Sequence, residues 1–223
     1  MRRLFTQDHV SMVLNAVAGW VDSMGYLSLL ASLRMFPSFM SGNLTKIVTD
    51  AVTGDFSSAR GIAGAVSAFF AGVIIARLVN GGAESRDPIS LAMVAFTLGV
   101  SALNLRLGGS EYLTLVLLAL GMGMINRAFS GHMAYQVRPF LSGVWVQLGS
   151  TLADVIVGRA SLSEAVGPTV TVGTVLIGAM SGAVAITYAN TTFAIAVPAS
   201  VVTLIVLVLL AGLVEPRDRE DGT

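Results

Sequence analysis

Residues 37–54 read PSFMSGNLTKIVTDAVTG, and this stretch decides the fold because it is polar where its surroundings are apolar. It carries Asn43, Lys46 and Asp50 between two long apolar segments. In a helix that begins near Gly42, these three side chains share one face. A Lys or an Asp at bilayer depth costs about 2.5–3.5 kcal/mol, so we expect such groups to face a protein interior or a wet cavity.

The composition predicts a polytopic α-helical membrane protein that forms a single membrane domain over residues 1–223, with the lipid bilayer as its partner. Of 223 residues, 54% are hydrophobic and only 12% are charged, whereas soluble domains carry about 25% charged residues. The formal net charge is zero, and no basic cluster is present to bind a nucleic acid. The chain has no cysteine, which excludes disulfides and thiolate chemistry.

Six apolar segments are long enough to cross the bilayer as continuous helices. We expect these helices at about Val10–Ser32, Arg60–Val79, Ile89–Leu105, Tyr112–Ser130, Thr169–Tyr188 and Thr192–Leu213.

Residues 138–158, RPFLSGVWVQLGSTLADVIVG, repeat the pattern of the first polar stretch. In both, a proline precedes Phe, an apolar residue, Ser and Gly, and further on an Asp stands four residues before a Gly. The sequence therefore predicts two internal repeats, at about 8–107 and 108–214, followed by a polar tail at 215–223. The expected break residues are Pro37, Ser41 and Gly42 in the first stretch, and Pro139, Ser142 and Gly143 in the second.

A proline and a Ser-Gly pair ahead of a short helix indicate a broken segment, with extended backbone first and a half-helix after it. If both half-helices are re-entrant, the chain crosses six times and the repeats are inverted; if both cross, it crosses eight times and they are parallel. Of the 13 Lys and Arg residues, the six-crossing arrangement puts nine on the inside and four outside. The eight-crossing arrangement gives seven and five and leaves Lys46 at membrane depth. Because cytoplasmic loops favour Lys and Arg, six crossings with cytoplasmic N- and C-termini are preferred, and the second stretch is still apolar enough to span.

The run Gly19-Trp20-Val21-Asp22, then Gly25-Tyr26-Leu27, and later Phe39-Met40-Ser41-Gly42-Asn43, resembles the YoaK family (domain of unknown function 1275). These are multi-pass bacterial membrane proteins, so the resemblance implies the bacterial inner membrane and this architecture over nearly the whole chain. It implies no substrate. The chain departs from the family pattern at Ser41, Ile125 and Gly143-Val144, and Lys46 and Asp50 are not family features.

In the first repeat, Asp22 lies in the middle of the first apolar helix, where a carboxylate is a candidate proton or cation site. The alternative is a structural hydrogen bond or ion pair, for which Lys46 is a candidate partner. Lys46 and Asp50 either face a substrate or form a pair within the helix. Asn43 either lines a cavity or caps the backbone.

In the second repeat, Gln147 and Asp154 mirror Asn43 and Asp50, and Asn126 interrupts an apolar helix. Gln147 is expected to line the same cavity, whereas Asp154 either joins it or lies at the membrane interface. The small-residue pattern from Gly178 to Gly182 suits helix packing or dimerisation.

The two histidines lack the spacing of metal ligands, and no nucleophile stands with a base, so we expect no metal, no cofactor and no enzyme activity. The sequence favours a small secondary transporter or channel-like permease for a small polar or ionic solute. Its site is expected at the repeat interface near the bilayer midplane, and a thin bundle of this size suggests a homodimer. The alternative is a non-transporting membrane scaffold or sensor whose polar residues specify helix packing.

Overall fold

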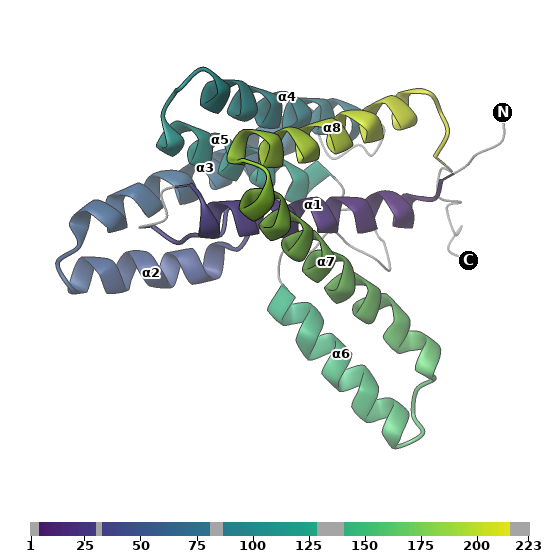
Figure 1. Cartoon of the computed structure of the whole chain (residues 1–223). Coiled ribbons are helices and arrows are strands. Elements are labelled where there is room, and N and C mark those ends of the chain that lie inside the picture. Colours follow the sequence, from purple (N-terminus) through teal and green to yellow (C-terminus); the bar gives the residue numbers. More distant parts are fainter. Residues whose placement is uncertain (1–4, 30–32, 81–86, 129–140, 215–223) are drawn as a thin grey trace.

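The computed structural model describes residues 5–29, 33–80, 87–128 and 141–214, and these residues form eight α-helices and one 3-10 helix without a β-strand. The all-helical class predicted from the sequence is confirmed (Figure 1). The predicted break residue Pro139 and the polar tail lie outside the described residues. The helices are α1 (Gln7–Leu27), α2 (Met40–Val52), α3 (Phe56–Asn80), α4 (Asp87–Arg106), α5 (Glu111–Ala128), α6 (Leu141–Ile156), η2 (Leu162–Ala165), α7 (Val166–Tyr188) and α8 (Thr191–Leu210).

Four helical segments are long and apolar enough to cross a bilayer, which gives the chain the character of a multi-pass membrane protein. They are Phe56–Asn80, Pro88–Arg106, Leu162–Tyr188 and Thr191–Leu210. The other two long helices, α1 and α5, are not among the four.

The expectation that the first helix continues to Ser32 is wrong, because α1 ends at Leu27. The carbonyl oxygen of Met24 accepts hydrogen bonds from the backbone N–H groups of both Ser28 and Leu29, which closes the last turn. Pro37 then packs against Gly25, where a side chain would have no room.

The two most extensive helix contacts pair α1 with α7 and α3 with α5. Both contacts are close enough for backbone to touch backbone, since a Cβ at Gly178 would overlap the Ala16 carbonyl and one at Gly123 would overlap that of Phe69. The small-residue pattern of α7 therefore serves packing within the chain, which is one of the two roles predicted for it. Helix α4 completes the bundle against α5 and α8.

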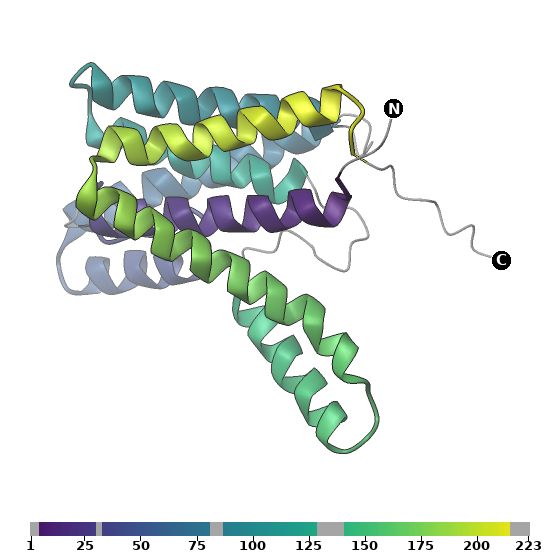
Figure 2. The same cartoon turned by 45° about the vertical axis from the view of Figure 1, so that its right-hand side comes forward.

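The two short helices, α2 and α6, begin near the middle of the molecule and run toward opposite ends (Figure 2). The turn after α2 lies at one end with the α4–α5 and α7–α8 turns, whereas the turn after α6 lies at the other end with both termini. There the backbone N–H of Phe5 donates to the carbonyl oxygen of Leu213 at 3.2 Å. The start of α1 and the end of α8 are thus on the same side of the molecule.

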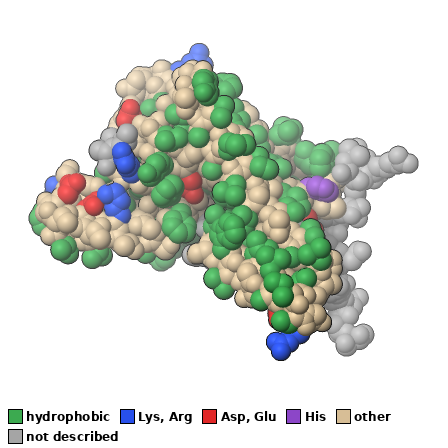
Figure 3. Space-filling view, turned by 60° about the horizontal axis from the view of Figure 1, so that its bottom comes forward, with side chains coloured by type: hydrophobic (Ala, Val, Ile, Leu, Met, Phe, Trp, Pro, Cys, Tyr) green, Lys and Arg blue, Asp and Glu red, His purple; other side chains and the backbone are tan. Residues whose placement is uncertain are grey.

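Apolar side chains are spread over the face shown in Figure 3, and most of the charged side chains on this face lie toward the edge of the molecule. Phe70, Phe96 and Leu78 are among the large apolar residues that remain exposed. A lipid-facing surface of this kind is what the bilayer requires of a spanning bundle.

Candidate functional site: a cavity where the two short helices begin

One face of α1 lines a cavity of about 560 Å³. Asn15, Gly19, Asp22 and Tyr26 recur on this face at helical spacing. The other walls come from α7, from the first turns of α6 and from the chain that leads into α2. They comprise Val175, Leu176 and Ala179; Leu141, Ser142 and Trp145; and Phe36, Ser38 and Phe39.

Asp22 is bound on both carboxylate oxygens by a single residue of the break before α2. Its Oδ1 accepts from the backbone N–H of Ser38 at 2.7 Å, and its Oδ2 accepts from the Ser38 hydroxyl at 2.6 Å. The carboxylate therefore holds the entry to α2 against α1, which is the structural alternative expected for it. It also lines the cavity, so the two roles do not exclude one another.

Asn43 closes the loop at the start of α2 by bonding the backbone of Phe36 twice. Its Oδ1 accepts from the Phe36 N–H at 3.2 Å, and its Nδ2 donates to the Phe36 carbonyl at 2.7 Å. Asn43 is buried and does not line the cavity. The capping alternative thus describes the contacts that Asn43 makes.

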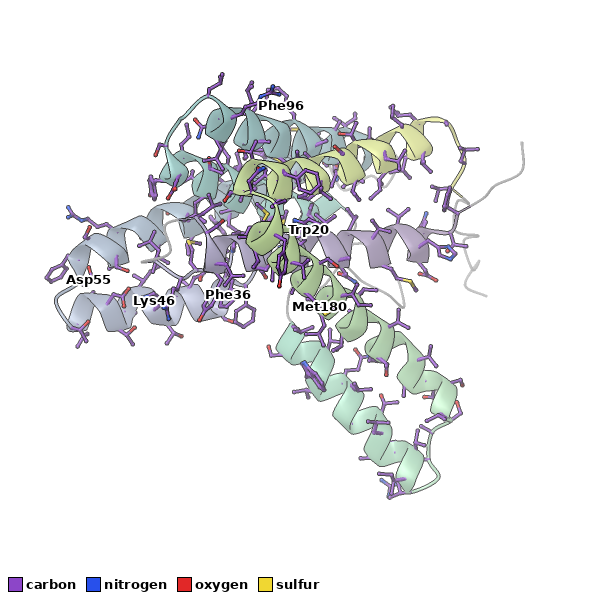
Figure 4. All side chains as sticks on the ribbon, viewed as in Figure 1. Trp20, Phe36, Lys46, Asp55, Phe96 and Met180 are labelled. Atoms are coloured by element: carbon purple, nitrogen blue, oxygen red, sulfur yellow. The ribbon has the colours of Figure 1, made fainter. Side chains whose placement is uncertain are left out.

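Lys46 pairs with Asp50 rather than with Asp22, at 2.7 Å between Nζ and Oδ2. The same Oδ2 accepts from the hydroxyl of Ser58 on α3 at 2.6 Å, which joins the two arms of the α2–α3 hairpin. The hydrogen bonds from Lys46 and Ser58 hold the pKa of Asp50 below its ordinary value. Lys46 projects from α2, and Asp55 marks the tip of the hairpin (Figure 4). This pair lies away from the cavity.

The candidates from the second repeat do not line this cavity either. Asn126 is half-buried on α5, and its buried Nδ2 has no hydrogen-bond partner among the described residues. Gln147 is exposed on α6, and Asp154 is half-buried near the end of that helix. Of the seven predicted binding residues, the structure brings only Asp22 to the cavity.

Asn15 was not predicted as a site residue, although it lines the cavity with Asp22. It is 2% exposed, and no described residue accepts a hydrogen bond from its Nδ2. Its position seven residues before Asp22, on the same helical face, was the available signal. Buried polar groups are normally paired, so this donor is an exception within the described lining of the cavity.

Apart from Ser23, Ser38 and Ser142, the remainder of the lining is apolar or aromatic. The rings of Tyr26 and Phe36 stack with centroids 5.0 Å apart, and Phe39 meets Phe36 edge-on. Within the described part of the lining, Asp22 is the one carboxylate, and no Lys, Arg or His is present. Among the described residues, no three His, Cys, Asp or Glu side chains are grouped to hold a metal ion. The arrangement suits binding of a small molecule with a polar or cationic group.

Comparisons with known proteins give a family and no further relative. Neither the curated proteins nor the solved structures contain a match. A family model described as "Protein of unknown function (DUF1275)" matches residues 10–209, from the first turn of α1 to the last turn of α8. This match covers most of the chain, which therefore belongs to the DUF1275 family.

Proposed function

We propose that this protein is a small permease, either a secondary transporter or a channel, that moves a small polar or ionic solute through the cavity beside Asp22. The observation that carries the proposal is the cavity itself. The cavity holds a carboxylate and an amide donor that has no partner among the described residues, and it lies where the two short helices begin. Irregular backbone inside a membrane bundle is tolerated where it lines such a cavity, and transport sites are built in this way.

The proposal includes two inverted repeats and six membrane crossings. Its support is the matching of turns: Gly54 after α2 and Gly158 after α6 both have positive φ. The residue after each glycine donates its N–H to the carbonyl of an Asp five positions earlier, at 2.8 Å in both cases. The opposite directions of α2 and α6 also favour inversion (Figure 2).

The location that we propose is the bacterial inner membrane, with both termini in the cytoplasm, as the distribution of Lys and Arg favours. A homodimer is part of the proposal. Its support is that α6 contacts only α7 and η2 among the described elements, so much of its surface is open to a second copy.

Osmotic swelling of proteoliposomes tests transport across a panel of solute classes. The panel comprises alkylamines, amino acids, sugars and inorganic anions, each compared with empty liposomes. We expect faster entry of at least one class, which Asp22→Asn abolishes. Asp50→Asn is the matched control, because it neutralises a carboxylate outside the cavity and should leave entry intact.

The competing function is a membrane scaffold or sensor without transport. It is favoured by one observation, that Asp22, Asn43 and Asp50 all make hydrogen bonds within the chain. Under that function no solute enters faster than into empty liposomes, and Asp22→Asn lowers the stability of the protein in detergent. This result would contradict the permease proposal.

A further inference from the structure

We infer that the cavity binds an organic ammonium ion that also carries a hydrogen-bond acceptor, with the ammonium at Asp22 and the acceptor at Asn15. This inference rests on the proposed function, in that it names the class of solute for the same cavity. The two residues mark two ends of one face of α1. Seven positions separate them, which corresponds to about 10 Å along the helix axis.

Asp22 defines the cationic end of the ligand. Each of its oxygens already accepts one hydrogen bond from Ser38, but an ionised carboxylate has about four lone-pair sites. No cationic side chain lines the described part of the cavity. Because Lys46 is bound to Asp50, it is not the counter-ion of Asp22. A positively charged ligand group would supply the charge partner that a partly buried carboxylate requires.

Asn15 defines the other end. The side chain of Asn15 lines the cavity, and its Nδ2 is a buried donor without a partner among the described residues. Rotation of the side-chain amide would present this donor to a ligand oxygen in the cavity. A ligand with an ammonium at both ends would leave this donor unpaired. A hydroxyl, an ether or a carbonyl group fits the position, since each accepts a hydrogen bond.

The wall between these ends is apolar. Gly19 lies between the two ends in close contact with the backbone of Val175 on α7, and Leu176 and Trp145 line the cavity from α7 and α6. A flexible hydrocarbon chain between the two polar groups therefore fits better than a highly hydroxylated body such as a sugar. The volume of about 560 Å³ lies within the ordinary range for small-molecule sites.

Titration calorimetry on the full chain in lipid nanodiscs tests the inference with four matched probes. 6-Amino-1-hexanol carries both polar groups, hexylamine only the ammonium, 1-hexanol only the hydroxyl, and 6-hydroxyhexanoate the opposite charge. Empty nanodiscs give the heat of partition into lipid, which is subtracted. We expect 6-amino-1-hexanol to bind most tightly, hexylamine about tenfold more weakly, and the other two not measurably.

Two variants test which residue binds each end of the ligand. Asn15→Leu should weaken 6-amino-1-hexanol about tenfold and leave hexylamine unchanged, because only the first probe reaches Asn15. Asp22→Asn should abolish binding of both amines. Since Asp22 also holds Ser38, thermal unfolding of each variant is measured beside the titrations. The Asn15 variant breaks no hydrogen bond of the Nδ2 donor within the described chain, so it keeps the test decisive if Asp22→Asn fails to fold.

The inference is overturned if 6-amino-1-hexanol and 1-hexanol bind equally, or if Asn15→Leu weakens both amines to the same extent. Equal binding of all probes would indicate a lipid-like ligand instead. Binding and solute entry are measured in separate experiments, so the permease function and the ligand class can be contradicted independently. Tight amine binding without solute entry contradicts the permease alone. Entry of another solute class without amine binding contradicts the ligand class alone.

Discussion

The indole Nε1 of Trp20 on α1 donates a hydrogen bond to the carbonyl oxygen of Ala194 on α8 at 2.8 Å. Pro198 stands four residues after Ala194 within α8. A proline has no N–H, so the carbonyl of Ala194 lacks its donor within the helix. Trp20 supplies that donor from a neighbouring helix, which satisfies the acceptor and joins α1 to α8 in one contact.

Trp20→Phe should lower the free energy of unfolding by about 1–3 kcal/mol, because it leaves a buried acceptor unpaired. In a Pro198→Ala background the helix can supply its own N–H to Ala194, and the same substitution should then cost less. Unfolding of the two single variants and the double variant in mixed micelles measures the coupling. Equal costs of Trp20→Phe in the two backgrounds would show that the proline does not create the need for the indole.

Gly178→Ala should destabilise the bundle by about 1–3 kcal/mol, because its Cβ would overlap the carbonyl of Ala16 on α1. Gly173 offers a matched control on the same helix, since nothing lies within 4 Å of a Cβ at that position. Gly173→Ala should be neutral or mildly stabilising, as alanine favours helix more than glycine does. Thermal unfolding in detergent compares the two variants, and similar losses for both would contradict the close contact of α1 with α7.

Local sequence features were sufficient to predict the helical class and the pair of short helices. Long apolar runs require helices in a bilayer, and a turn glycine four residues after an Asp marks the end of both α2 and α6. Gly54 and Gly158 adopt positive φ, a conformation that glycine reaches without a steric cost. Such turns involve neighbours in sequence, and for that reason the residue pattern alone reveals them.

The cavity could not be predicted in the same way, because it depends on contacts between distant segments. Asp22 meets Ser38 only because the chain turns back after α1, and a local residue pattern does not predict the course of the chain there. Asn15 becomes a cavity residue through the placement of α6 and α7. Lys46 has the right charge to pair with Asp22, but it pairs with Asp50 instead. Asp50 stands four residues further along the same helix face, so this pair forms without the ordering of a loop.

Asp50→Asn should loosen the α2–α3 hairpin, because it weakens the bonds to Lys46 and Ser58. The Lys46 side chain is 32% exposed, so solvent screens the pair and we expect only a small loss of global stability. Hydrogen exchange over residues 41–60 should rise in the variant while exchange in α8 stays unchanged. Equal exchange of wild type and variant in the hairpin would mean that these bonds do not hold it.

The difference in the free energy of unfolding between wild type and Asp50→Asn should become smaller at low pH. The pKa of Asp50 lies below its ordinary value of 3.8, so its charged form stabilises the folded state at every pH above that value. The contribution is lost as the pH falls from the ordinary pKa through the lowered one. Unfolding measured at intervals from pH 7 to pH 3 should show a constant difference that shrinks only below about pH 4. A difference that instead disappears between pH 7 and pH 5 would contradict a lowered pKa.

Labels at positions 55 and 164 should reach opposite sides of the membrane. Asp55 marks the tip of the α2–α3 hairpin (Figure 4), and Glu164 lies in η2 on the turn between α6 and α7. These turns lie at opposite ends of the molecule (Figure 2), as re-entrant short helices require. The chain contains no cysteine, so Asp55→Cys and Glu164→Cys each give a single reactive thiol without further changes. In intact cells or right-side-out vesicles, a membrane-impermeant maleimide should label only position 55. Labelling of both positions, or of neither, would place the two turns on one side and favour eight crossings with parallel repeats.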